Sequence, residues 1–208
     1  MTWSGAGSVL VVMCGISCSG KSTAAEKLRD ALDAVLVSTD LVRKHSDLNK
    51  VSLSRHPLER YVVYYRALKK AEELLQHGRH VIMDGTFILR ILRQAAYYTA
   101  SNTCSNAFLV HCFCNNYGLI QHRYGLRQKN NNMFDAWQKI EGHNVKYLEF
   151  ENLDKEVMPD GRPVPIIRND TEKSKAEIVY SDGSETMGKM VRALTRPAYD
   201  NNLELMTN

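Results

Sequence analysis

A glycine-rich segment that follows a short apolar run is the feature that most constrains how this chain can fold. Residues Gly15 to Ser22 read G-I-S-C-S-G-K-S and fit the phosphate-binding pattern G-x-x-x-x-G-K-[ST]. Before them, Ser8 to Cys14 (SVLVVMC) is continuously apolar and rich in β-branched residues, which is typical of a strand buried on both faces of a parallel sheet. After them, Ser22 to Asp33 carries apolar residues at helical spacing. The motif therefore lies between a strand and a helix, the context that a triphosphate-binding loop requires.

The residue types in this loop predict how a triphosphate binds. Glycines let the backbone approach the phosphates, and the helix N-terminus adds a positive field. We expect Lys21 to reach the outer phosphates and Ser22 to ligate Mg²⁺, with ATP as the nucleotide. A chance match in a glycine-containing turn is the alternative. The predicted nucleotide-binding residues of the loop are Gly15, Ser17, Cys18, Ser19, Gly20, Lys21, Ser22 and Thr23.

Strands and helices alternate along the rest of the chain. This alternation predicts an α/β fold of the P-loop NTPase type, with a doubly wound parallel sheet of about five strands, helices on both faces and a helical lid. The segment after Val164 to Asn169 is a candidate for holding the adenine. Beyond the strand and helix that flank the loop, the expected strands are 34–38, 80–84, 107–114 and 164–169, and the expected helices are 58–77, 87–99, 119–128 and 185–194.

Bulk composition limits the class of protein. A chain of 208 residues that is 44% hydrophobic can close one core, so we expect a single domain over 1–208 with a lid at approximately 116–150. The net charge of +4 weakly favours phosphate-bearing partners. No stretch approaches the roughly 18 apolar residues of a membrane span, so no membrane partner is expected. The sequence carries no indication of oligomeric state.

The five cysteines give no framework of disulfides, which favours a cytoplasmic location. Three potential metal ligands, His111, Cys112 and Cys114, lie close together in the sequence. In an extended strand Cys112 and Cys114 share one face and His111 takes the other, so this spacing argues against a metal site.

Two residues just past the second expected strand are candidates for handling a phosphate acceptor. Asp40 lies at the carboxyl edge of the sheet, where a carboxylate can take a proton from an attacking hydroxyl. Arg43 follows three positions later, so in a helical turn it shares a side with Asp40 and can clamp an acceptor phosphate. The structural alternatives are an N-cap at Asp40 and a solvated arginine at Arg43.

Asp84 ends the apolar strand 80–84 and precedes Gly85 and Thr86. Its position matches the acidic residue that helps to hold Mg²⁺ in P-loop enzymes. Alternatively, Asp84 orients the acceptor or caps the next helix. We assign both Asp84 and Thr86 to the substrate side.

Arg123 and Arg127 are four residues apart in the expected lid helix, and so they lie on one face of it. Closure of a lid can bring both guanidinium groups over the phosphates. We predict that both bind the nucleotide and that Arg127 stabilises the transition state, while exposed, solvated arginines are the alternative.

These segments together resemble the P-loop kinases that include polynucleotide 5′-kinase, zeta toxins and chloramphenicol phosphotransferase. The resemblance covers roughly the first two thirds of the chain: GISCSGKST is similar to their phosphate loop, TDLVR (Thr39 to Arg43) to a D-x-x-R motif, and RYGLR (Arg123 to Arg127) to a pair of lid arginines. DGTF at Asp84 is similar to their second acidic position, and MFDAWQKIE (Met133 to Glu141) to a region after the lid. The resemblance implies that Asp40 is the general base, Arg43 an acceptor clamp and Arg127 the transition-state arginine. The sequence carries no phosphatase or ligase signature of a complete end-repair enzyme.

Phosphoryl transfer needs an acceptor in line, a base for its proton and positive charge over the transferred group. Lys21, Asp40 and Arg127 offer the catalytic parts, so the leading hypothesis is an ATP-dependent kinase that phosphorylates a hydroxyl of a nucleic acid or nucleotide. A kinase of small metabolites or antibiotics is the close alternative. A third hypothesis, from another class, is a nucleotide-switched binding module that has no acceptor.

Overall fold

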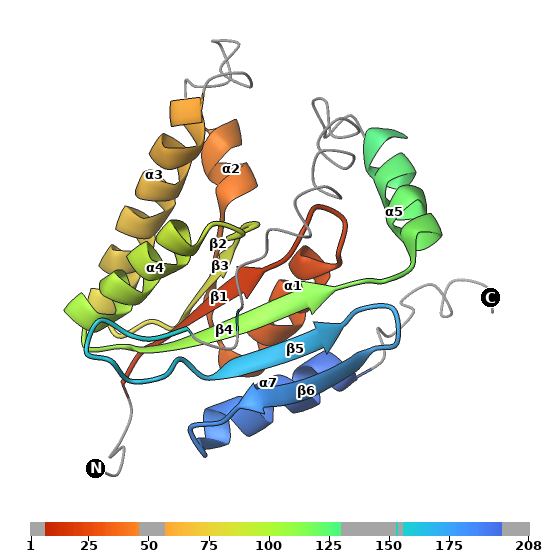
Figure 1. The fold of residues 1–208 in the computed structure, drawn as a ribbon. Helices are drawn as coiled ribbons and strands as arrows, with labels where there is room; N and C mark the ends of the chain where they lie inside the picture. Colours follow the sequence, from red (N-terminus) through yellow and green to blue (C-terminus); the bar gives the residue numbers. More distant parts are fainter. Residues whose placement is uncertain (1–6, 46–56, 130–152, 154–155, 197–208) are drawn as a thin grey trace, which may run out of the picture.

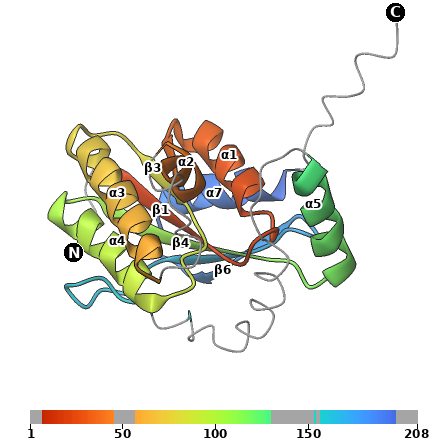
Figure 2. The same cartoon turned by 90° about the horizontal axis from the view of Figure 1, so that it is seen from above.

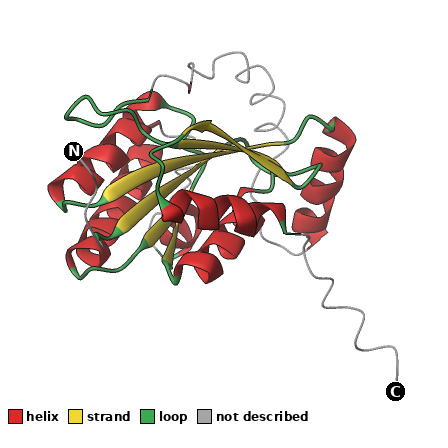
Figure 3. Ribbon diagram, turned by 90° about the horizontal axis from the view of Figure 1, so that it is seen from below, coloured by secondary structure: helices red, strands yellow, loops and turns green. Residues whose placement is uncertain are grey.

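The computed structural model describes residues 7–45, 57–129, 153 and 156–196. It confirms the predicted α/β fold: a central sheet lies between helices (Figures 1 and 3). The strands are β1 (Val9–Cys14), β2 (Val35–Ser38), β3 (Val81–Asp84), β4 (Asn106–Phe113), β5 (Ile166–Asp170) and β6 (Lys175–Tyr180). The helices are α1 (Lys21–Leu32), α2 (Thr39–Lys44), α3 (Pro57–Gln76), α4 (Arg90–Asn102), α5 (Tyr117–Lys129) and α7 (Glu185–Thr195).

The sheet has six strands in the order β2-β3-β1-β4-β5-β6. The first five in this order run parallel, as the alternation of strands and helices predicts. Strand β6 is antiparallel to β5 and forms the edge of the sheet, and it lies outside the elements expected from the sequence. Strand β1, which precedes the glycine-rich loop, lies between β3 and β4, so this loop has strand ends on both sides.

Side chains of β1 alternate between two apolar layers. Leu10, Val12 and Cys14 pack with α3 and α4 on one face of the sheet. Val9, Val11 and Met13 pack with α1 and α7 on the other. This explains why the sequence of β1 is continuously apolar, since a strand covered on both faces has no solvated side.

Local signals explain where two helices begin or end. Gly78 follows α3 with a φ of 72°, and the Gly78 N–H donates to the carbonyl of Leu75 at 2.9 Å. It ends the helix in the left-handed conformation that glycine adopts without strain. At α7, the Ser184 hydroxyl accepts a hydrogen bond from the Met187 N–H at 3.2 Å and caps the N-terminus.

The carboxyl ends of the five parallel strands meet along one edge of the sheet, where the predicted site residues are placed. Viewed from above, α5 lies at the opposite end of the strands from α3 and α4 (Figure 2). Of the predicted lid, residues 117–129 form α5, and residues 130–150 lie outside the described part of the chain. Within the described residues, no helix is both long enough and apolar enough to cross a membrane.

Candidate active site

The phosphate loop has the backbone conformation that its glycines predict. Gly15 has a φ of 147° and Gly20 a φ of 87°, both in the region that favours glycine. A Cβ on Gly15 would collide with the carbonyl oxygen of Cys112, and one on Gly20 would lie 2.9 Å from the side chain of Thr171. Cys18 also has a positive φ, 63°, which is unusual for a residue with a side chain. The loop is therefore tightly packed against the neighbouring strand ends.

Lys21 begins helix α1 and is buried, with 7% of its surface exposed. Its ammonium group donates a hydrogen bond to the carbonyl of Ile16, inside the loop. Gly20 precedes α1 and supplies no side-chain cap, so the first turn keeps its N–H groups directed into the loop. A helix N-terminus with a buried lysine is suited to binding an anion.

Asp40 and Arg43, the residues predicted to handle a phosphate acceptor, form an ion pair on helix α2. The Nη1 atom of Arg43 lies 2.9 Å from Oδ1 of Asp40, and the side chains are 35% and 80% exposed, respectively. The N-cap of α2 is Ser38, which accepts from the N–H of Leu41, and Asp40 lies in the first turn. The structure therefore excludes Asp40 as the cap, and its carboxylate is accessible to solvent.

Asp84 lies between the phosphate loop and α2. In the sheet it is paired with Met13 of β1 on one side and with Ser38 of β2 on the other. The Thr39 hydroxyl donates to the backbone carbonyl of Asp84 at 3.2 Å, and Asp84 is 9% exposed. Helix α4 begins after Leu89 with no side-chain cap, so Asp84 does not cap it. This placement leaves the magnesium and acceptor roles open to Asp84.

Thr86 belongs to the β3–α4 loop (residues 85–89). Hydrogen bonds from the phosphate loop, α3 and α4 hold this loop in place. The carbonyl of Thr86 accepts from the N–H of Gly15 at 3.1 Å, joining this loop to the phosphate loop. Tyr64 of α3 contacts the N–H groups of Thr86 and Phe87. Arg93 of α4 donates to the carbonyls of Phe87 and Ile88 at 2.9 and 2.6 Å.

Arg93 is itself held by a buried carboxylate from a distant part of the chain. Its Nη2 atom lies 2.8 Å from Oε1 of Glu156, and the two side chains are 0% and 1% exposed. Burial acts to lower the pKa of Arg93, but the hydrogen bond to Glu156 and the nearby Cys14 and Glu156 raise it above its ordinary value. Arg93 therefore stays charged and fixes the β3–α4 loop to the segment that begins at Glu156.

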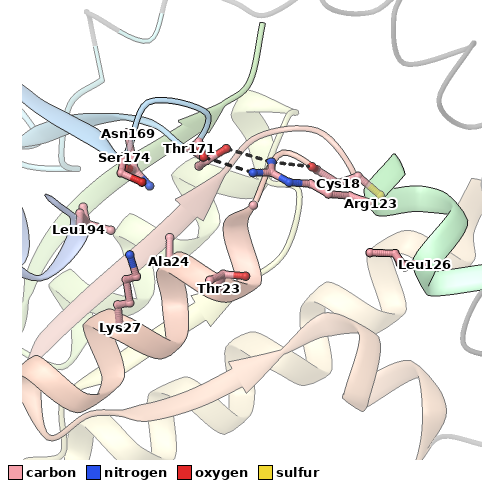
Figure 4. A pocket seen from close by; sticks show the side chains of 11 residues that line it. Cys18, Thr23, Ala24, Lys27, Arg123, Leu126, Asn169, Thr171, Ser174 and Leu194 are labelled. Atoms are coloured by element: carbon pink, nitrogen blue, oxygen red, sulfur yellow. Dashed lines mark hydrogen bonds between the residues drawn. The ribbon is translucent and has the colours of Figure 1, made fainter. Parts of the chain in front are cut away.

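The guanidinium group of Arg123 in α5, a predicted nucleotide-binding residue, contacts the backbone of the phosphate loop. It donates to the carbonyl of Cys18 at 3.3 Å, and to the hydroxyl and carbonyl oxygens of Thr171 at 3.1 and 3.2 Å (Figure 4). The Thr171 hydroxyl also lies 2.7 Å from the carbonyl of Ser19. Arg127 lies in α5 as predicted, but its side chain falls outside the described part of the structure.

A cavity of about 390 Å³ opens beside these residues (Figure 4). It adjoins the phosphate loop at Gly20 and lies between α1, α5, α7 and the turn that follows β5. Residues that line it include Thr23, Lys27, Arg123, Thr171, Ser174 and Leu194. The predicted adenine-holding segment, which follows Val164 to Asn169, contributes Thr171 and Ser174 to this wall.

Among the described side chains, the phosphate-loop residues, Asp40, Asp84, Thr86 and Arg123 lie at or just past the carboxyl ends of the parallel strands, whereas the side chain of Arg127 is not described. Four residues that sequence reasoning missed also contact this region: Tyr64, Arg93, Glu156 and Thr171. The first three hold the β3–α4 loop, and Thr171 joins the turn after β5 to the phosphate loop. None belongs to a recognisable motif, and the charged or polar neighbours of Arg93 and Glu156 in the sequence give no signal that these two side chains are buried.

The central β1, the loop after it and the parallel sheet define a P-loop NTPase. Family comparison agrees, and the chain belongs to the AAA domain family (AAA_33), which matches residues 10–140. No curated protein sequence matches the chain.

Several solved structures share this fold. A candidate kinase from Chloroflexus aurantiacus J-10-fl is 14% identical, with a TM-score of 0.56 over 88% of this chain and 92% of that one. A sugar kinase from Janibacter sp. HTCC2649 is 17% identical, with a TM-score of 0.53 over 91% and 93%. A gluconokinase from Sinorhizobium meliloti 1021 is 17% identical, with a TM-score of 0.50 over 98% of each chain. At these identities the likeness shows the fold.

Proposed function

We propose that this protein is an ATP-dependent kinase that transfers the γ-phosphoryl group to a hydroxyl of a nucleic acid or nucleotide. One observation carries the proposal: two carboxylates, Asp40 and Asp84, lie at the carboxyl ends of the strands next to the phosphate loop. A protein that only hydrolyses a nucleotide needs no exposed carboxylate on the acceptor side. The resemblance of TDLVR and DGTF to polynucleotide 5′-kinase motifs supports the choice of acceptor.

Each residue has a defined part in this reaction. The loop N–H groups and Lys21 bind the triphosphate, and the cavity beside Thr171 receives the nucleoside. Asp40 takes the proton of the attacking hydroxyl, and Arg43 exchanges its contact with Asp40 for one with the acceptor. Arg127 stabilises the charge that develops on the transferred group.

The donor set also suits Mg²⁺, since a hydroxyl and a carboxylate are the hard oxygen ligands that this ion prefers. Ser22 follows Lys21 at the start of α1, and Asp84 ends the neighbouring strand β3. These two residues would hold the ion, which would neutralise charge on the phosphates.

A small-metabolite kinase is the second candidate. It is favoured by the sugar kinase and the gluconokinase, whose fold this chain shares over nearly its whole length. Salt dependence separates a nucleic acid from a neutral small acceptor: phosphorylation of a nucleic acid should weaken steeply as salt rises, whereas phosphorylation of a neutral sugar should be almost insensitive to it.

The test is transfer of label from γ-labelled ATP to a panel of nucleic-acid ends, nucleosides and sugars. We expect Asp40→Asn to lower kcat by about 10²–10⁴-fold while ATP binding is retained, because it removes a base and no phosphate contact. We expect Lys21→Ala to lower kcat by about 10²–10³-fold, because it removes a donor to the phosphates.

Matched controls separate these effects from loss of surface charge. Asp30, like Asp40, is an exposed carboxylate 2.9 Å from an arginine, and Lys70 is an exposed lysine. Asp30→Asn and Lys70→Ala should leave turnover unchanged. If Asp40→Asn keeps full ATP turnover and no acceptor is labelled, the nucleotide-switched module is the better description.

A further inference from the structure

The hydroxyl of Tyr64 sits at the centre of the β3–α4 loop and is surrounded by three partners. The backbone N–H groups of Thr86 and Phe87 donate to it at 3.1 and 3.2 Å. The hydroxyl of Thr86 lies 3.1 Å away, in a contact that allows either oxygen to be the donor. Tyr64 is 3% exposed, so these protein groups, and not bulk water, satisfy its hydrogen bonds.

The direction of the contact between the two hydroxyls follows from counting donors and acceptors. A phenol oxygen has one proton and two lone pairs. Both lone pairs are taken by the N–H groups of Thr86 and Phe87. Burial raises the pKa of Tyr64, so the phenol keeps its proton at neutral pH. Tyr64 therefore donates that proton to Thr86.

Since the Thr86 hydroxyl oxygen accepts a hydrogen bond from Tyr64, the Thr86 hydroxyl proton is directed to another group. Thr86 is only partly buried, and its carbonyl accepts from Gly15, the first residue of the phosphate loop, at 3.1 Å. Asp84, two residues earlier, borders α2. The Thr86 hydroxyl can thus donate its proton to a group that binds between the phosphate loop and helix α2.

We propose that Thr86 donates a hydrogen bond to a phosphate or carboxylate oxygen of the acceptor, and that Tyr64 is the positioning residue that fixes this polarity. The proposal rests on the proposed kinase function, adds the residue that binds an anionic oxygen of the acceptor, and excludes neutral sugars from the small-metabolite alternative. Such an oxygen has no proton and can only accept, so it matches a hydroxyl that must donate.

Charge on the neighbouring helix favours the same choice. Helix α2 carries Arg43 and Lys44 against one carboxylate, Asp40, so its side chains contribute a net positive charge at this edge. An anionic group on the acceptor gains from that field, and a neutral sugar does not.

The test compares Thr86→Val, Thr86→Ser and wild type on two charged probes, a nucleoside 3′-monophosphate and gluconate. The neutral partners of these probes are the nucleoside and glucose. For the charged probe that is phosphorylated, Thr86→Val should raise KM by about 10–100-fold, the range for losing a hydrogen bond to a charged group. Thr86→Ser should stay within about threefold of wild type. The Kd for ATP should be unchanged in both variants, and the neutral partner should show no comparable penalty.

Tyr64→Phe tests the positioning role. It should raise KM for the same probe, but the increase should vanish when it is added to Thr86→Val, because both changes remove one interaction. A purely structural Tyr64 would instead give additive effects. If Tyr64→Phe does not fold, the two Thr86 variants still test whether Thr86 binds an anionic oxygen of the acceptor.

Two outcomes would overturn the inference while the kinase assignment stands: an unchanged KM in Thr86→Val, or an equal penalty on charged and neutral probes. Failure of the kinase assignment is seen separately, as wild-type protein that labels no acceptor. In that case, titration calorimetry of the two charged probes into protein loaded with a non-hydrolysable ATP analogue tests Thr86 directly. Equal affinity of Thr86→Val and wild type, or no binding by either, counts against the proposal.

Discussion

Two arginine–carboxylate pairs near the candidate active site have nearly equal lengths. Arg93 and Glu156 are 2.8 Å apart and buried, whereas Arg43 and Asp40 are 2.9 Å apart, with Asp40 80% exposed. The same chemistry therefore operates in two environments. Burial makes the first pair costly to disturb, and exposure leaves the second pair weak.

This difference matches the roles proposed for the two pairs, one in positioning a loop and one in the reaction. Arg93 also donates to two carbonyls of the β3–α4 loop, so its pair fixes the backbone that carries Thr86 next to the phosphate loop. Arg43 and Asp40 form an exposed pair, so the proposed exchange of Arg43 from Asp40 to an acceptor would cost little. A rigid loop beside exchangeable side chains is what a site needs when it must bind and release a substrate.

The largest expected effect on stability is loss of the buried pair. Arg93→Met should lower the free energy of unfolding by about 3–5 kcal/mol, because it leaves the Glu156 carboxylate buried without its partner. Arg43→Met should change it by at most about 1 kcal/mol, since that pair is exposed. Urea unfolding followed by circular dichroism measures both.

A double variant sharpens this contrast. Replacing both partners, with Arg93→Met and Glu156→Leu, should recover much of the lost stability, because no charge remains buried. Equal effects of Arg93→Met and Arg43→Met would show that burial does not distinguish the two pairs.

The next effect concerns the junction between the β3–α4 loop and the phosphate loop. Gly15→Ala should destabilise the protein by about 2–4 kcal/mol, because the new methyl group meets the Cys112 carbonyl at a φ of 147°. Gly78→Ala is the matched control: its φ is 72°, but nothing lies within 4 Å, so we expect about 1 kcal/mol of backbone strain alone. Thermal unfolding measures the stability lost by each variant. Equal losses would mean that the close packing at Gly15 does not contribute to the destabilisation.

The sequence predicted those parts of the fold whose signals are local. Strand β1, the phosphate loop and α1 are consecutive, so motif and periodicity together define them. Strand β6 was missed because most of its residues are exposed on the sheet edge, which leaves no alternation of buried and solvated positions.

The contacts that hold the site could not be predicted in the same way. Tyr64 meets Thr86 across 22 residues, Arg93 meets Glu156 across 63, and Thr171 meets Ser19 across 152. A single sequence gives the periodicity of each segment but not which residues of distant segments come together. Asp40, Asp84 and Thr86 could be predicted as site residues because each lies at or just past the end of a strand, and such ends share one edge in a parallel sheet.

The smallest expected effect is the response of buried thiols near the β3–α4 loop to alkaline pH. Cys14 donates to the carbonyl of Phe87 at 3.4 Å, and burial raises its pKa from 9.0 to about 12. Above pH 9 the unfolded chain loses this proton while the folded chain keeps it, so stability falls as pH rises, by about 1 kcal/mol at pH 10. Cys14→Ala should make that fall shallower by this amount, whereas Cys104→Ala, at an exposed cysteine, should leave it unchanged. Urea midpoints measured between pH 8 and about pH 10 test this, and identical slopes in wild type and Cys14→Ala would show that the thiol is not protected by the packing that holds the loop.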